Sequence, residues 1–217
     1  MSLERIHRLY ILTCLYFSPA TLFDKINALP WYRDALCSWA DSLGCQAGDS
    51  ILEVGCATGR LTRHLAQRGA LAHGVDTSPR MLRKAQAANP GVARFELASA
   101  LDLPYANERF DFVIAASLLN ILAEPEAAMS EMARVCRPGG TVSVLVPQAG
   151  MSGEAIAKLA DRLNLSGFSR EALRTWHRRA PKMQRDTVLE YFSAAGLHEV
   201  CCASHLAGMV LTVTGSR

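Results

Sequence analysis

The stretch Ile51-Leu-Glu-Val-Gly-Cys-Ala-Thr-Gly-Arg60 joins a short apolar segment to a turn that contains two glycines. Residues 50–54, which include the apolar segment, have the length and composition of a buried strand, and residues 61–68 are expected to form a helix. Glycine lets the backbone approach a ligand closely, and the first turn of a helix offers free N–H donors. We therefore expect residues 55–59 to form a ligand-binding turn.

Two common ligand classes do not fit this turn. A dinucleotide fingerprint that starts at Gly55 needs glycine two and five residues later, where the chain has Ala57 and Arg60. A phosphate loop would end in Gly-Lys-Ser or Gly-Lys-Thr, and this turn does not. The remaining pattern is Glu53 followed by Gly55 and Gly59. An acid beside the turn favours a cationic ligand over a phosphate.

Strands and helices alternate along the chain after this turn. Ser78 and Pro79 suit the N-cap and first position of a helix, and Arg137-Pro-Gly-Gly140 is a stop signal for a helix at 124–136. This alternation predicts a parallel sheet covered by helices on both faces. The further strands are expected at 70–75, 93–97, 110–116 and 141–146.

The two ends of the chain are expected to add helices and a hairpin. Residues 1–48 are predicted to be mostly helical, with breaks at Pro19 and Pro30. The apolar run 9–17 is too short to cross a membrane, so we expect an amphipathic helix that folds over the domain or lies on a partner. The later expectations are a polar helical insertion at 150–181, a helix at 187–195 and a hairpin formed by 200–204 and 209–214.

Five ordered segments resemble the motifs of class I S-adenosylmethionine-dependent methyltransferases. After the glycine turn, His73-Gly-Val-Asp-Thr-Ser-Pro-Arg-Met-Leu82 is similar to the second motif of that family. The other three segments are Ala98–Tyr105, Phe110–Asn120 and Arg134–Gly140. The resemblance covers about residues 50–147, and five matches in order are more specific than any single one.

The resemblance implies an α/β protein with the three-layer, Rossmann-like methyltransferase fold. Its seven-stranded sheet would be mostly parallel, with an antiparallel C-terminal strand and extra helices as a lid. The chain 1–217 would be a single methyltransferase domain. Its expected parts are an N-terminal helical lid at 1–48, a cofactor-binding core at 50–147, a helical insertion at 150–180, and a C-terminal helix and hairpin at 183–217.

The same resemblance implies S-adenosylmethionine as the cofactor and S-adenosylhomocysteine as the product. Glu53 is expected near the amino-acid end of the cofactor, Asp76 at the ribose hydroxyls and Met81 against the adenine. The full set of expected cofactor-binding residues is Glu53, Gly55, Cys56, Ala57, Thr58, Gly59, Asp76, Thr77, Met81, Ser99, Ala100, Leu101, Ala116 and Ser117.

Two of these positions depart from the family pattern. Ala57 replaces the middle glycine of the first motif, which is tolerable if the backbone there avoids positive φ. Ser99 stands where relatives commonly have an acid, and its hydroxyl accepts a hydrogen bond without carrying a charge. These departures leave open a non-catalytic protein that only binds the cofactor.

The acceptor is expected to be a small molecule. Methyl transfer from a sulfonium is an in-line displacement, so positioning and exclusion of water are the main tasks of the protein. A general base is needed only when the nucleophile carries a proton. The candidates for a catalytic role are His177, Asn120 and Tyr16. Because none is a clear base, a thiol or a soft carbon would suit the site.

A basic segment at 170–185 supports an alternative function. Arg170, Arg174, Arg178 and Lys182 recur every four residues, as on one face of a helix, although Pro181 should end the helix before Lys182. A solvated face is expected, and the alternative is an RNA or protein methyltransferase that uses this face. We do not expect a nucleic-acid partner, because aromatic interleaving is confined to Trp176.

Composition narrows the class of protein further. The 217 residues are 50% hydrophobic and 20% charged with a net charge of +3, which excludes intrinsic disorder. The seven cysteines form no C-x-x-C pair, and Cys201 and Cys202 would face opposite sides of a strand, so no metal is expected. Reduced thiols, with no transmembrane or secretory segment, predict a cytoplasmic protein. The oligomeric state is not determined by the sequence.

Overall fold

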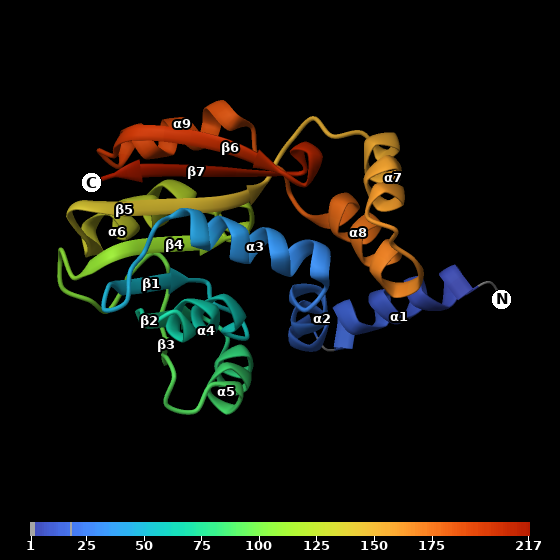
Figure 1. The fold of residues 1–217 in the computed structure, drawn as a ribbon, viewed down its shortest axis with the longest axis horizontal. Helices are drawn as coiled ribbons and strands as arrows, with labels where there is room; N and C mark the ends of the chain where they lie inside the picture. The colour runs from blue at the N-terminus through green and yellow to red at the C-terminus, as the bar shows by residue number, and fades with distance from the viewer. Residues whose placement is uncertain (1–2, 18) are drawn as a thin grey trace.

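The computed structural model describes residues 3–17 and 19–217. Within these residues, seven strands form one mixed sheet. They are β1 (Ser50–Val54), β2 (Leu71–Asp76), β3 (Arg94–Leu97), β4 (Phe110–Ala116), β5 (Cys136–Pro147), β6 (His198–His205) and β7 (Val210–Ser216). The spatial order is β3-β2-β1-β4-β5-β7-β6 (Figure 1).

Strand direction agrees with the predicted fold. The first five strands pair in parallel, and β7 runs antiparallel to both β5 and β6. The hairpin predicted at the C-terminus is confirmed, with the short helix η2 (Leu206–Gly208) at its turn. Because parallel strands end at the same edge of a sheet, the turns after β1, β2 and β4 meet there.

Helices cover both faces of the sheet, as the alternation predicted. Neighbouring strand residues alternate between the two cores: Ile51 and Ile114 belong to one, whereas Leu52 and Val113 belong to the other. The first core is covered by α3 (Pro30–Ser42) and α4 (Arg60–Gln67), and the second by α6 (Pro125–Val135) and α9 (Arg185–Ala194). The helix α5 (Pro79–Ala88) begins with Ser78 as its N-cap, as predicted.

One strand boundary differs from the prediction. The Arg137-Pro-Gly-Gly140 run does end α6, but β5 begins at Cys136 and not at the expected residue 141. Cys136 pairs with Phe110 and Thr141 pairs with Phe112, so the residues between them are an irregularity within the strand. A glycine with φ of 69° at position 139 accommodates that irregularity, which a local pattern of turn residues cannot distinguish from a loop.

Helices from the N-terminal segment and from the segment after β5 lie together beyond the carboxyl edge of the sheet (Figure 1). They are α1 (Leu3–Phe17), α2 (Pro19–Asn27), α7 (Gly153–Arg162) and α8 (Gly167–Arg179). The helix α1 packs against both α2 and α8. The helix α8 ends before Pro181, so Lys182 lies outside it, as predicted. Among the described residues, no helix is long and apolar enough to cross a membrane.

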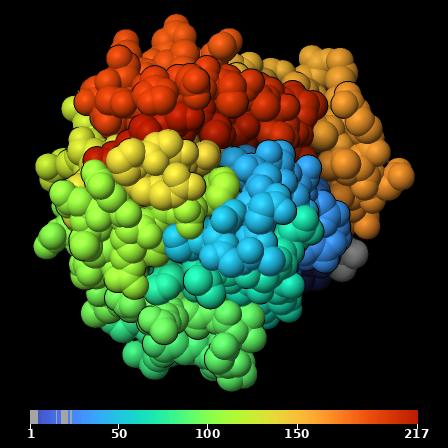
Figure 2. All heavy atoms as spheres, turned by 60° about the vertical axis from the view of Figure 1, so that its left-hand side comes forward, coloured from blue at the N-terminus to red at the C-terminus, as the bar shows by residue number. Residues whose placement is uncertain are grey.

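The far end of α3 is fixed to the C-terminal strands. The indole Nε1 of Trp39 donates to the Ser143 hydroxyl on β5 at 3.0 Å, and Ser143 pairs with the Thr214 hydroxyl on β7 at 2.6 Å. Figure 2 shows the surface on this side, where the light-blue end of α3 lies beside the red C-terminal segment. This anchoring gives α3 a fixed position from which its first turn reaches the opposite edge of the sheet.

Candidate functional site

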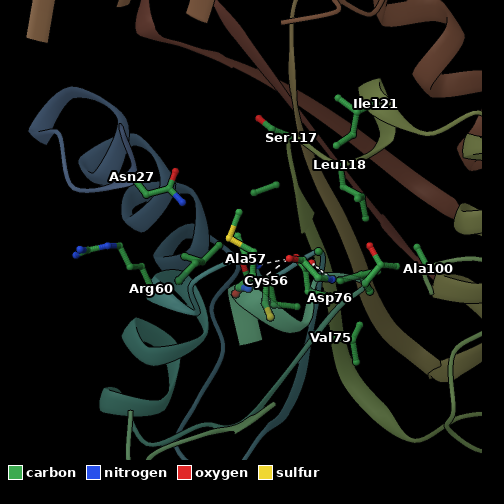
Figure 3. A pocket seen from close by; sticks show the side chains of 18 of the residues that line it. Asn27, Cys56, Ala57, Arg60, Val75, Asp76, Ala100, Ser117, Leu118 and Ile121 are labelled. Carbon is green, nitrogen blue, oxygen red and sulfur yellow. Dashed lines mark hydrogen bonds between the residues drawn. The ribbon is translucent and has the colours of Figure 1, made fainter. Parts of the chain in front are cut away.

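A cavity of about 360 Å³ lies at the carboxyl edge of β1, β2 and β4 (Figure 3). This volume is in the range of small-molecule sites. Of the expected cofactor-binding residues, all but Thr58 and Gly59 line it. Figure 3 shows Asn27 and Arg60 on one side of the cavity and Ala100 and Leu118 on the other.

Glu53 is a buried carboxyl group in the wall of this cavity. Its side chain is 4% exposed and accepts a hydrogen bond from the Thr62 hydroxyl. Burial raises the pKa of Glu53 to about 8, and the charge of Asp76 adds to that rise, while the hydrogen bond from Thr62 opposes it. No cationic side chain is among the groups that shift the pKa of Glu53, so a cationic ligand group would supply an opposite charge. The residue therefore suits the ammonium group of S-adenosylmethionine.

Asp76 connects the turns that follow β1 and β2. Its Oδ2 accepts from the backbone N–H of Ala57 at 2.9 Å, and its Oδ1 accepts from the backbone N–H of Ser78 at 2.8 Å. Each carboxylate oxygen has capacity for one more hydrogen bond, and the residue lines the cavity. The carboxylate thus holds the loop and remains able to accept from ligand hydroxyls.

Ala57 corrects one expectation. Its backbone has φ of 48°, so the position that lacks the family glycine is in the left-handed region after all. A side chain in that region costs roughly 1 kcal/mol because Cβ approaches the backbone. Ser117, at the end of β4, is also left-handed with φ of 52°. Strained residues of this kind cluster at ligand sites, and both of these line the cavity.

Gly59 is required for a reason that we did not expect. It does not line the cavity, and a Cβ added to it would lie 2.6 Å from the ring of Phe95 and 3.0 Å from Ala85. Its φ of 71° also favours glycine. Close approach to the ligand stays a prediction, and the structure adds a second need for glycine in the close packing of the turn on β3 and α5.

Ser99 uses its hydroxyl locally. The side-chain oxygen accepts from the backbone N–H of Leu101 at 3.1 Å, which shapes the segment after β3. Both residues line the cavity, and Asp102 is exposed on the surface. Ser99 therefore contributes an uncharged side chain to the cavity lining, at the position where the family pattern has an acid.

The rest of the cavity is lined by residues of α2, α3 and α8 and of the segment after β4. Apart from the polar Ser117 these residues are apolar or aromatic, and the set is Ile26, Tyr32, Leu36, Ser117, Ile121 and Trp176. The Tyr32 hydroxyl lies 3.0 Å from the Ser117 hydroxyl, and the rings of Tyr32 and Trp176 are 5.9 Å apart. Burial raises the pKa of Tyr32, so its hydroxyl stays protonated. Sequence reasoning missed Tyr32, because an aromatic residue in a helical stripe is ordinarily a core residue.

The three catalytic candidates do not line the cavity. Tyr16 is 82% exposed on α1, and the Asn120 amide donates to the Pro181 carbonyl at 3.2 Å. His177 follows the cavity residue Trp176 on α8, and burial together with nearby Lys182 lowers its pKa. Among the residues that do line the cavity there is no histidine. The structure thus offers no imidazole base at this site.

One ion pair connects α2 to the glycine turn, and another reduces the net charge of α8. Asp24 accepts from the Arg60 guanidinium at 2.8 Å and from the Thr58 hydroxyl at 3.3 Å. Burial acts to raise the pKa of Asp24, but Arg60 and Thr58 outweigh it and lower the pKa. On α8, the Arg178 guanidinium lies 3.0 Å from the buried carboxylate of Glu171. The expected basic face is therefore partly neutralised within the helix.

Comparison with known proteins fits this geometry. Residues 52–144 match the model of a methyltransferase domain. The chain is 34% identical over 151 residues to a phosphatidylethanolamine N-methyltransferase of Cereibacter sphaeroides. The aligned residues are 67% of this chain and 69% of that protein. The chain belongs to the family of S-adenosylmethionine-dependent methyltransferases. S-adenosylmethionine is the cofactor of this family, and the buried carboxyl group of Glu53 in the cavity wall fits its ammonium group.

Other relatives of this chain match over shorter segments. A demethylmenaquinone methyltransferase of Tropheryma whipplei is 36% identical over 136 residues, which are 58% of this chain and 54% of that protein. Uncharacterised mycobacterial relatives match over 38% of their length. This chain therefore spans about half or less of the length of several curated relatives.

Solved structures share the fold at low identity. A TehB-like S-adenosylmethionine-dependent methyltransferase of Corynebacterium glutamicum has a TM-score of 0.61 at 19% identity, with 84% of this chain and 86% of that chain covered. The [4+2]-cyclase SpnF has a TM-score of 0.65 at 19% identity, with 86% and 82% covered. Because one of these neighbours is named for another reaction, the fold of this chain does not by itself define its chemistry.

Proposed function

We propose that the protein transfers a methyl group from S-adenosylmethionine to a small molecule bound beside it in the same cavity. The observation that carries the proposal is that residues of two chemically different kinds line one cavity, which we interpret as two ends. One end is formed by the strand-end turns with Glu53 and Asp76, and the other by Tyr32, Trp176 and apolar side chains.

The cofactor end would bind through charge and backbone geometry. Glu53 would pair with the ammonium group, Asp76 would accept from the ribose hydroxyls and Met81 would contact the adenine. The cofactor, when bound, supplies an activated methyl group on a sulfonium. No further activation of the donor is required of the protein, so its residues would bind, orient and exclude water.

The acceptor end supports an apolar or amphipathic molecule. Ile26, Leu36 and Ile121 offer apolar surface, and Trp176 and Tyr32 offer ring faces. The Tyr32 and Ser117 hydroxyls are polar groups that could orient one oxygen or nitrogen of the acceptor. The relatives named for demethylmenaquinone and phosphatidylethanolamine have acceptors with a large apolar part, which favours the same class here.

The lining offers no strong base for a protonated nucleophile. Its ionisable groups near the acceptor are Arg60, which pairs with Asp24, and Tyr32, whose raised pKa keeps it protonated. The proposed acceptor atom is therefore one that is already unprotonated or that ionises readily, such as a thiol or an electron-rich carbon. An RNA or protein acceptor is less well supported, because Arg170 and Arg178 already pair with Asp161 and Glu171.

Two measurements test the proposal in sequence. Isothermal titration with S-adenosylmethionine should give one site per chain, and its absence would remove the cofactor from the proposal. Methyl-labelled cofactor mixed with a metabolite extract should then label a small, organic-extractable product. Label found only in macromolecules would support the RNA or protein alternative, and cofactor binding without any transfer would support the non-catalytic one.

A further inference from the structure

The helix α1 carries a broad apolar face that the rest of the described chain leaves exposed. Among the described residues, six of the twelve exposed large apolar side chains belong to this one helix. The most exposed are Tyr16 at 82%, Phe17 at 71% and Leu9 at 58%. The six are Ile6, Leu9, Tyr10, Leu12, Tyr16 and Phe17. Single exposed apolar residues are ordinary, whereas a contiguous set on one helix indicates an interaction surface.

Helical spacing places these side chains on the outward side. His7, Ile11 and Cys14 follow one another at intervals of four and three residues, and Ile11 and Cys14 are buried. This inward side packs on α2 and α8, and the Tyr10 ring meets Phe168 of α8 at its margin, 6.0 Å away. On the opposite side, Leu9, Leu12 and Tyr16 follow one another at intervals of three and four residues. The helix is thus held by one face and presents a second apolar face outward.

Positive charge borders the exposed face. Arg5 and Arg8 are exposed on the first turns of α1, and the ammonium of exposed Lys25 lies 5.0 Å from the Tyr10 ring. The sequence from residue 5 to residue 17 contains no aspartate or glutamate. An exposed helical face of apolar and aromatic residues with cations beside it suits a lipid–water interface.

We propose that the exposed face of α1 docks on an anionic lipid surface. The apolar side chains would enter the interface, and Arg5, Arg8 and Lys25 would contact the headgroups. A second copy of the chain would bring the same three cations to the contact, and Glu4 is the one acid in the sequence of α1. The charge pattern therefore favours an anionic surface over self-association.

Docking would also orient the cavity. The two helices that hold α1 are α2 and α8, and they contribute Ile26, Asn27 and Trp176 to the acceptor end. A lipid surface bound by α1 would thus lie close to the end of the cavity that we assign to the acceptor. The docking proposal does not depend on methyl transfer, because it concerns only the outer side of α1.

Co-sedimentation of the full chain with lipid vesicles tests the proposal. Vesicles of phosphatidylcholine with phosphatidylglycerol should sediment the protein, and vesicles of phosphatidylcholine alone should do so much less. The double variant Leu9→Glu with Tyr16→Glu should bind the anionic vesicles at least about tenfold more weakly, because two apolar anchors are lost and two negative charges are added. The neutral pair Leu9→Gln with Tyr16→Gln separates loss of apolar contact from repulsion.

The matched control places the same charges on exposed apolar residues elsewhere. Leu71→Glu with Val92→Glu changes side chains that are 61% and 44% exposed and should leave vesicle binding unchanged. Circular dichroism should show the same fold in all variants. Equal vesicle binding by the wild type and the α1 variants, or equal binding to both vesicle types, would overturn the proposal. A dimer in sedimentation velocity that the α1 variants abolish, without vesicle binding, would assign the face to a second copy.

Discussion

Asp76, at the end of β2, accepts a hydrogen bond at 2.9 Å from the backbone N–H of Ala57, in the turn after β1. The other carboxylate oxygen accepts from Ser78 at 2.8 Å. One side chain therefore joins two turns that lie 19 residues apart in the chain. The residue assigned to the ribose hydroxyls is also the residue that fixes the shape of the glycine turn.

Replacing Asp76 by Asn should affect both roles. The amide has one acceptor oxygen, so the N–H of Ala57 or of Ser78 loses its partner, and the charge-assisted bonds to a ligand become weaker. We expect cofactor affinity to fall on the order of tenfold, with faster amide exchange at residue 57 or 78. The control Asp186→Asn removes a charge from the exposed start of α9 and should change neither. Unchanged cofactor affinity in Asp76→Asn would contradict the assignment.

Glu53→Gln should weaken cofactor binding and stabilise the free protein. The pKa of Glu53 is raised from 4.5 to about 8, so the folded protein holds a proton that the unfolded chain releases between these values. Stability contributed by that proton is present below pH 4.5 and is lost as the pH rises through about 8. Glutamine keeps the neutral form, so the variant should gain a few kcal/mol, about as the pKa shift implies, near the upper end of that window.

The two effects of Glu53→Gln are measured separately. Thermal unfolding between pH 4.5 and about 8 gives the stability. Titration with S-adenosylmethionine over the same range gives the affinity. In the wild type the affinity should rise with pH as Glu53 ionises, and in the variant it should not depend on pH in this way. A variant that binds as well as the wild type would show that the carboxylate does not pair with the ammonium group.

Ala57→Gly should cost little or nothing in stability. Glycine relieves roughly 1 kcal/mol of left-handed strain, which offsets the greater entropy of the unfolded chain. The control Ala66→Gly lies within α4, where the same change should cost about 1 kcal/mol. Denaturant unfolding of both variants tests the difference. If Ala57→Gly is as destabilising as Ala66→Gly, then position 57 is not strained in solution.

Tyr32→Phe should impair the acceptor end and spare the cofactor end. The change removes the hydroxyl that lies 3.0 Å from Ser117 and should lower stability by about 1 kcal/mol. Affinity for S-adenosylmethionine should stay within about twofold, whereas methylation of the identified acceptor should show a raised KM or a lowered kcat. Tyr191→Phe on α9 serves as the control, because Tyr191 packs in the other core. Loss of cofactor binding in Tyr32→Phe would argue against the two-ended cavity.

Asp24→Asn should loosen the helices that cover the acceptor end. The substitution weakens the pair with Arg60 that connects α2 to the glycine turn. Hydrogen exchange with and without S-adenosylhomocysteine should show faster exchange in α2, and turnover should fall more than cofactor affinity. Asp34→Asn, which breaks the exposed pair with Arg33, is the matched control. Equal protection of α2 and α8 with and without ligand would reject a mobile lid and favour fixed packing.

The sequence by itself determined the alternation of strands and helices in this protein and the sheet edge at which a ligand site is expected. Alternating strands and helices specify a parallel sheet, and Glu53, Gly55 and Asp76 lie at strand ends, so their meeting at one edge follows from the direction of the strands. These are local signals, and local signals are readable from the chain.

Only the tertiary structure decided what depends on contacts between distant segments. The left-handed backbone of Ala57 is set with the help of Asp76, and the need for glycine at position 59 comes from the ring of Phe95. The acceptor end joins Tyr32, Ser117 and Trp176 from three separate parts of the chain. No local pattern encodes such meetings, because packing energy depends on which surfaces come together and not on which residues are neighbours in sequence.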